Sequence, residues 1–119
     1  MRLTRGQINW VKEFASEGYD LSELLFRNFP DAKISIIKRY IPNLSGNYIH
    51  DVYFSREEAE ETVKKIPIKS GEKFFTEYYI IEGFFRNLFK GKIFDERMGV
   101  PVDEVDQMVI YSKLEKNLK

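Results

Sequence analysis

The chain has 119 residues, the length of one compact domain or of a small domain with an appended helical part. Nineteen basic residues balance nineteen acidic ones, so no overall charge draws the protein to nucleic acid or to a membrane surface. Any contact with a polyanion must therefore come from a local patch or from dimerisation, and the absence of cysteine excludes disulfides, thiolate zinc sites and cysteine nucleophiles.

The sequence contains no recognisable membrane or export segment. It has no run of about eighteen uninterrupted apolar residues, which is what a membrane-spanning helix needs. The first ten residues, MRLTRGQINW, lack the apolar stretch of a signal peptide. We therefore expect a cytoplasmic protein that makes no membrane contact.

Two helices are predicted at the start of the chain. Thr4 and Gln7 have the spacing of a capping box, so a first helix should begin at Arg5, and Gly18 should end it. Asp20 repeats the same start signal for a second helix, which a proline then stops.

A third helix is expected between Asp31 and Pro42, because Ile34, Ile37 and Ile41 recur at helical spacing. This stripe would face the core and turn the remaining side chains outward or to the flanks. The remaining side chains are Ala32, Lys33, Ser35, Ile36, Lys38, Arg39 and Tyr40. Two short helices at an angle, the second with a polar face, are the core of a helix-turn-helix.

The first third of the chain resembles the homeodomain-like and Myb-like tri-helical family, which includes small helix-turn-helix modules of resolvases and phage regulators. The pattern is carried by Trp10, the Gly18-Tyr19 bend, Leu21-Ser22-Glu23-Leu24, Ile34-Ser35-Ile36-Ile37 and Tyr40-Ile41. The resemblance implies that the third helix enters the major groove of double-stranded DNA. It also implies that Arg2 and Arg5 lie near the DNA backbone or in the minor groove.

The candidate nucleic-acid-binding residues follow from this arrangement. They are Arg2, Arg5, Lys33, Ser35, Ile36, Lys38, Arg39 and Tyr40. Arginine and serine can contact base edges, an isoleucine can contact a thymine methyl group, and lysines can contact phosphates. A tri-helical unit used only for packing or for contact with a protein is the competing interpretation.

The middle of the chain carries no catalytic or metal-binding signal. Residues 48–54 (YIHDVYF) are rich in aromatic and β-branched residues, which predicts a short strand or an extended arm. His50 and Asp51 are the only histidine–carboxylate neighbours, and a lone histidine is more often structural than catalytic. Ser55 and Glu58 form a capping box for a helix over 56–66, whose acidic run we interpret as a solvated face.

The last third is predicted to be helical. Residues 73–94 place aromatic and aliphatic side chains at core helical spacing, and Gly91 should end this helix. A hairpin that pairs 66–69 with 73–81 is the second-ranked alternative. A last helix over 102–118 has two apolar faces, so residues 73–118 are expected to form a homodimer interface.

The sequence thus predicts a mainly α protein. A tri-helical helix-turn-helix over 1–47 precedes a short extended segment and three further helices in 48–119, as two parts or one continuous domain. We expect a small dimeric DNA-binding protein, a transcriptional regulator of a virus or mobile element. The alternative is a protein-interaction module or inhibitor that binds no nucleic acid. The common enzyme motifs are missing, so we expect no enzymatic activity and no cofactor or metal.

Overall fold

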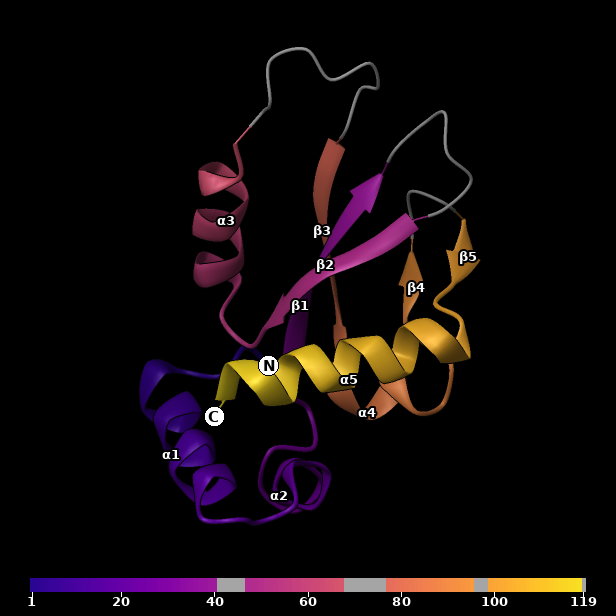
Figure 1. Ribbon diagram of the computed structural model, residues 1–119. Helices are drawn as coiled ribbons and strands as arrows, with labels where there is room; N and C mark the ends of the chain where they lie inside the picture. Colours follow the sequence, from indigo (N-terminus) through magenta and orange to yellow (C-terminus); the bar gives the residue numbers. More distant parts are fainter. Residues whose placement is uncertain (41–46, 68–76, 96–98, 119) are drawn as a thin grey trace.

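The computed structural model describes residues 1–40, 47–67, 77–95 and 99–118, and it shows a mixed α/β fold with antiparallel sheets (Figure 1). The predicted mainly α, all-helical architecture is therefore wrong. The elements are α1 (Arg5–Ser16), α2 (Leu21–Asn28), β1 (Lys33–Tyr40), β2 (Asn47–Tyr53), α3 (Arg56–Lys65), β3 (Glu77–Phe84), α4 (Phe85–Leu88), β4 (Phe94–Asp95), β5 (Val100–Pro101) and α5 (Glu104–Leu118).

The two N-terminal helices form as predicted. The hydroxyl of Thr4 accepts a hydrogen bond from the Gln7 backbone N–H, and the Gln7 side chain accepts one from the Thr4 N–H. Gly18 follows α1 with a positive φ of 98°, a conformation that favours glycine. Asp20 precedes α2 but its side chain makes no capping hydrogen bond.

The predicted third helix is instead β1, the central strand of a three-stranded sheet, so residues 33–40 do not form the recognition helix expected of a helix-turn-helix. The strand order is β2-β1-β3, and both neighbours of β1 run antiparallel to it. The run ISII fits a helical stripe, but it also fits a strand covered on both faces. Its β-branched residues favour the strand once partner strands are available. Pro42 and Ile41 lie outside the described residues.

The predicted aromatic helix is also wrong, because its described part forms β3 and then one turn of helix, α4. Residues 77–84 are mostly aromatic or β-branched, which suits a strand. Among the described residues, β3 pairs with β1. The alternative hairpin of 66–69 with 73–81 is described only at residues 66–67 and 77–81, of which 77–81 are extended. Residues 68–76 lie outside the described part of the chain.

Three elements of the C-terminal half form as predicted. The segment after residue 47 is a strand, and Ser55 caps α3 by accepting a hydrogen bond from the Glu58 N–H. The last helix, α5, spans nearly the predicted range. Between α4 and α5, residues 94–95 form the short strand β4, which pairs with β5.

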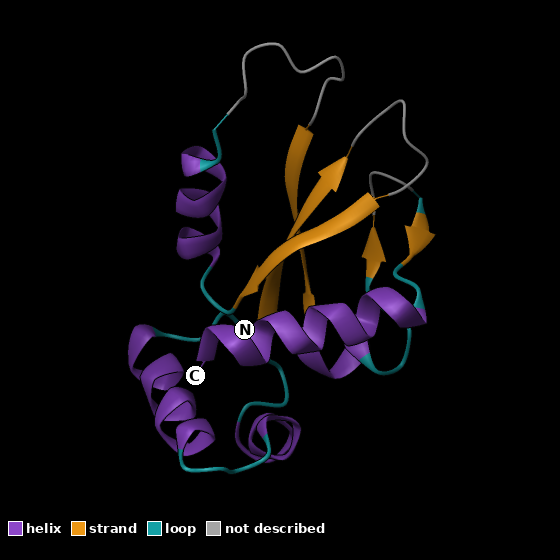
Figure 2. Ribbon diagram, in the orientation of Figure 1, coloured by secondary structure: helices purple, strands orange, loops and turns teal. Residues whose placement is uncertain are grey.

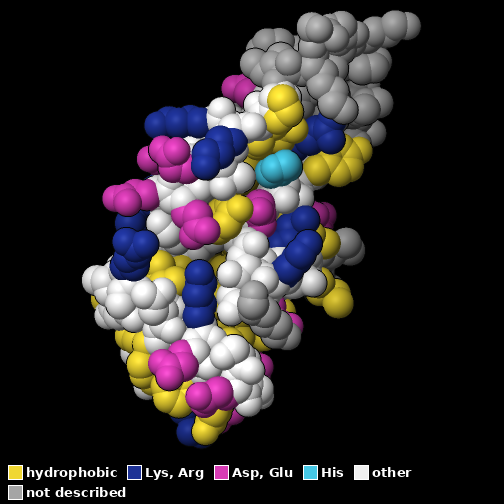
Figure 3. Space-filling view, turned by 60° about the vertical axis from the view of Figure 1, so that its left-hand side comes forward, with side chains coloured by type: hydrophobic (Ala, Val, Ile, Leu, Met, Phe, Trp, Pro, Cys, Tyr) yellow, Lys and Arg dark blue, Asp and Glu magenta, His cyan; other side chains and the backbone are white. Residues whose placement is uncertain are grey.

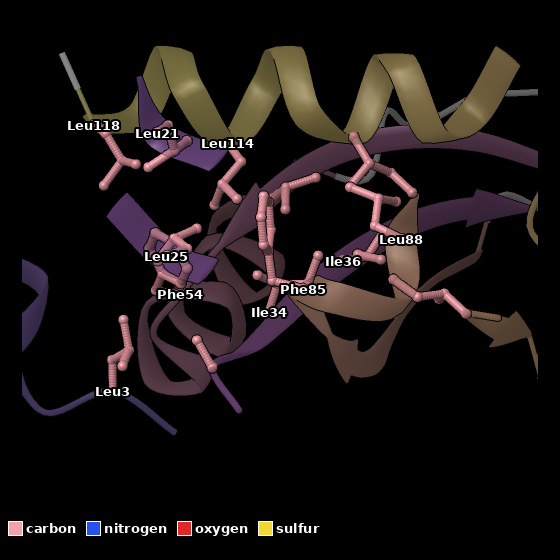
Figure 4. Packing of buried hydrophobic residues seen from close by; sticks show 14 of the residues in the cluster. Leu3, Leu21, Leu25, Ile34, Ile36, Phe54, Phe85, Leu88, Leu114 and Leu118 are labelled. Carbon is pink, nitrogen blue, oxygen red and sulfur yellow. The ribbon is translucent and has the colours of Figure 1, made fainter. Parts of the chain in front are cut away.

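One core joins the sheet to helices α2, α4 and α5 (Figure 4). Ile34 and Ile36 of β1, Phe85 of α4 and Leu114 of α5 are all essentially fully buried there. The same cluster includes Leu25 of α2, so both halves of the sequence contribute to it.

The sheet therefore lies between two sets of helices. Figure 2 shows α5 running across the lower end of the sheet, with α4 beside it and α1 and α2 beneath, while α3 stands along one side. α3 contacts all three strands, and Ala59 and Ile37 are buried outside the main cluster. Gly83 in β3 lets the side chain of Ile93 approach closely, since a Cβ there would lie 3.1 Å from it.

Candidate protein-interaction surface

The residues that the sequence assigned to nucleic acid do not form one exposed face. Side chains alternate between the two faces of a strand, so neighbours in β1 point in opposite directions. Ser35, Ile36 and Lys38 are 1%, 0% and 3% exposed. Their predicted outward orientation is therefore wrong, because β1 is covered on both faces.

The remaining three candidates in β1 are half-buried. The ammonium of Lys33 lies 5.6 Å from the centre of the Phe84 ring, a cation–π contact on the neighbouring strand. Arg39 and Tyr40 occupy the far end of β1 and point to opposite faces of the sheet.

Two further candidates lie before or at the start of α1, on the surface. Arg2 donates from its Nε and Nη2 atoms to the two carboxylate oxygens of Glu82, at 3.0 and 3.1 Å. This bidentate pair fixes the chain end to β3. Arg5 is exposed at the first turn of α1.

Lys38, which was predicted to contact phosphate, forms a buried ion pair instead. Its Nζ lies 2.6 Å from Oδ2 of Asp95 in β4, and the two residues are 3% and 0% exposed. The Tyr79 hydroxyl donates to the same carboxylate oxygen at 2.8 Å. Lys38 is therefore part of the join between the sheet and the β4–β5 pair.

Several exposed apolar side chains lie together on a surface made by α2, the end of α4 and α5. We call it the aromatic surface and define it as Phe26, Phe89, Met108 and Tyr111. Phe26, Phe89 and Met108 are 45%, 50% and 75% exposed, and Tyr111 is half-buried. The three elements lie together at one end of the molecule (Figure 1). Exposed apolar groups gathered in this way are typical of interaction sites.

The rings of this surface rest on a buried one. Phe85 is 1% exposed, and its ring centre lies 5.6 Å from that of Phe26 and 5.5 Å from that of Phe89. Phe89 also meets the ring of Tyr111 at 5.6 Å, in an edge-on geometry that aromatic pairs favour. The exposed rings are therefore held in place from below.

A shallow hollow of about 550 Å³ opens beside these rings. It is lined by Phe89, Gln107, Met108, Tyr111, Ser112 and Glu115. Except for Phe89, the lining residues recur at helical spacing along one side of α5. The hollow is thus a stripe of helix surface with one aromatic wall.

Opposite charges stand at the two ends of this hollow. Gly91 lies beside the side chain of Gln107, so the neighbouring exposed Lys90 belongs to the end nearer the start of α5. Glu115 lines the other end, eight positions further along the same helix. At 1.5 Å per residue, roughly 12 Å of helix separates the two ends.

Sequence reasoning did not single out this surface. It placed Phe89 in a core stripe and Met108 on one of the two apolar faces of the last helix, and it gave Phe26 no role. One signal was available: Phe26 falls beside the Leu21, Leu24 and Leu25 face of α2 instead of on it. A phenylalanine that interrupts the polar side of a helix is a candidate for contact with a partner.

Comparisons with known proteins found no matching family model, no matching curated protein and no matching solved structure. Within the described ranges, no helix is long and apolar enough to cross a membrane. Nor do the described residues contain a group of three or more His, Asp or Glu side chains placed to hold a metal ion.

Proposed function

We propose that this protein is a self-associating interaction module and that a second copy of the chain binds to its aromatic surface. The observation that carries the proposal is the set of exposed rings and Met108, fixed over buried Phe85. Burying such groups on association stabilises a complex by roughly 25 cal/mol per Å² of apolar surface. The proposal agrees with the sequence-based hypothesis of a dimer formed through residues 73–118.

A two-fold axis suits the shape and charge of this surface. In a symmetric dimer, each Met108 can enter the hollow of the other copy, because the hollow lies directly beside it. An antiparallel approach also brings Lys90 of one copy towards Glu115 of the other. The balanced charge of the chain adds no net repulsion between copies.

The sequence-based hypothesis of a DNA-binding regulator stays a prediction. The helix that was expected to enter the major groove is the strand β1. The competing hypothesis, an interaction protein, has more support because a defined apolar contact surface exists. We therefore place self-association first and regard contact with a different protein as one outcome of the test below.

Sedimentation velocity from micromolar to sub-millimolar concentration tests the proposal. We expect a reversible dimer that Phe89→Asp converts to a monomer, because a carboxylate would be buried at the interface. Phe94→Asp is the matched control, since Phe94 is 49% exposed but lies on β4, outside the aromatic surface. Circular dichroism should show that both variants keep the fold.

Charge exchange tests the orientation. Lys90→Glu and Glu115→Lys should each weaken the dimer, and combining them should restore it. A wild-type chain that stays monomeric throughout would overturn the proposal, as would equal loss of the dimer in the Phe94 control. Dimers that ignore both charge variants would overturn the antiparallel arrangement.

A further inference from the structure

A second cluster lies at the opposite end of the sheet, and the proposed dimer does not use it. It is centred on Arg39 in β1. In the sheet register Arg39 stands between Tyr48 of β2 and Tyr78 of β3. Directly opposed residues share a face, so two aromatic side chains flank one guanidinium.

A bulge in β2 adds a histidine to this face. The register between β1 and β2 shifts between Ile37 and Lys38, which leaves His50 as the extra residue. A bulge redirects the side chain that it inserts. The His50 ring meets the edge of the Tyr78 ring at 5.2 Å, across the strand that separates them. Figure 3 shows the histidine, in cyan, with hydrophobic, basic and acidic side chains around it.

The cations of this cluster have no acidic partner among the described residues. Neither Arg39 nor Lys113 of α5 forms an ion pair there, although both lie near enough to His50 to lower its pKa, after the larger effect of burial. The Nε of Arg39 is buried without a hydrogen-bond acceptor among these residues. Leaving such a donor unpaired is unfavourable, so a bound acceptor that reoriented the guanidinium would be favoured.

The carboxylate of Asp51, which acts on the pKa of His50, makes its hydrogen bonds with other groups. One carboxylate oxygen of Asp51 accepts hydrogen bonds from the Val52 N–H and from Nδ2 of Asn117, at 2.9 and 2.8 Å. The other accepts one from the Tyr53 hydroxyl at 2.7 Å. The Asp51 carboxylate thus accepts three hydrogen bonds, and it forms no ion pair with Arg39 or Lys113 among the described residues.

We propose that this face binds a single-stranded nucleic acid, with phosphates held by Arg39 and Lys113 and bases stacked on Tyr48 and Tyr78. A cation between two aromatic side chains offers both contacts that an unpaired strand needs. An acidic peptide would use the cations but not the rings. In a duplex the base faces are stacked inside, so the tyrosines could not reach them.

Fluorescence anisotropy with a labelled short oligothymidine at low salt tests the proposal. The double variant R39Q/K113Q should weaken binding by roughly tenfold or more and make it less dependent on salt, because two phosphate contacts are lost. Tyr48→Leu should weaken it by roughly fivefold, since one stacking surface is removed. Tyr48 is 49% exposed, so this variant should fold normally.

The matched control is R5Q/K12Q, which removes the same charge from α1 and should leave the affinity within about twofold. This control also distinguishes binding at the Arg39 cluster from the sequence-based prediction, in which Arg5 contacts nucleic acid. No binding of oligothymidine by the wild type would overturn the proposal, as would equal weakening by the control.

Competitors decide the class of ligand. Unlabelled oligothymidine should displace the probe, whereas polyphosphate, polyglutamate and duplex DNA should compete more weakly at equal charge. Equal competition by polyphosphate would show that stacking plays no part, and preference for polyglutamate would indicate an acidic protein partner. Either result would overturn the assignment to nucleic acid.

Discussion

Two neighbouring residues at the end of β1, Lys38 and Arg39, have the same charge and opposite surroundings. Lys38 is buried at 2.6 Å from Asp95, which also accepts a hydrogen bond from Tyr79. Arg39 points to the other face, between Tyr48 and Tyr78, with no ion pair among the described residues. One residue of strand register decides which cation is used to hold the fold together and which is left for a ligand.

The comparison shows why positive charge alone does not mark a binding site. In the helical interpretation both cations lay near the same outward face, so both were assigned to DNA. In the strand they are separated by alternation, and only the cation without an internal carboxylate keeps its charge available. Burial with a partner indicates a structural role, whereas partial exposure beside aromatic rings indicates binding.

The largest expected effect comes from breaking the buried pair. Lys38→Met should lower the free energy of unfolding by about 3–5 kcal/mol, because the buried Asp95 carboxylate would lose its cationic partner. Arg39→Met should change it by less than about 1 kcal/mol, since no ion pair is lost. Urea denaturation of the two variants measures this difference directly.

A double variant separates the effect of the ion pair on stability from the effect of side-chain packing. Lys38→Met with Asp95→Leu should lose less stability than Lys38→Met alone, because no buried charge remains. Lys33→Met, in the same strand but half-buried against Phe84, is the control and should lose about 1 kcal/mol or less. Similar losses for Lys38→Met and Arg39→Met would contradict the comparison.

Local signals predicted those parts of the fold that are decided locally. The Thr4–Gln7 capping box fixes the start of α1 within one turn, and Ser55 does the same for α3. The run of isoleucines in β1 fits two periods equally well, and its partner in β3 lies more than forty positions away. Pairing with this distant strand makes the segment a strand and not a helix, and the local sequence pattern carries no information about that partner.

The candidate surfaces were less predictable for the same reason. Phe85 and Phe89 sit four positions apart in an apolar segment, yet one is 1% exposed and the other 50%. Only the turn from β3 into α4 sets which of them faces the core. The site around Arg39 depends on two strand partners and on a bulge, which are features of the sheet and not of any one segment.

A smaller effect is expected from the side chain of Asn117, which donates two hydrogen bonds to β2. Its Nδ2 donates to Asp51 Oδ1 at 2.8 Å and to the Val52 carbonyl oxygen at 2.6 Å, on the edge strand β2. Asn117→Ala should lower the free energy of unfolding by about 1–2 kcal/mol through the loss of these bonds. Asn9→Ala, at an exposed position of α1, controls for helix propensity.

Asn117→Ala also tests whether Arg39 binds a ligand because it has no acidic partner, unlike Lys38. With one donor removed, the Asp51 carboxylate can turn towards Arg39 and give it the acidic partner that Lys38 already has. We therefore expect Asn117→Ala to weaken oligothymidine binding as well as stability. A variant that is destabilised but binds normally would show that Asp51 has no influence on the Arg39 face.

The smallest effect is a pH dependence that His50 gives to this face. Burial lowers the pKa of His50 below its ordinary value of 6.5, with Lys113 and Arg39 acting in the same direction and Asp51 opposing them. In the unfolded chain the imidazole has its ordinary pKa, so it takes up a proton before the folded one does. The stability contributed by neutral His50 is therefore present above pH 6.5 and is lost as the pH falls through the folded pKa.

Nucleic-acid binding should change in the opposite direction over the same interval. Each folded molecule that gains a proton on His50 presents one more positive charge beside Arg39 and the Tyr78 ring, which attracts phosphate. His50→Gln should flatten both profiles, in urea midpoints and in anisotropy, while leaving the values at neutral pH nearly unchanged. If acid strengthens binding equally in His50→Gln, the titrating group lies elsewhere, and the bulge serves only to place a ring against Tyr78.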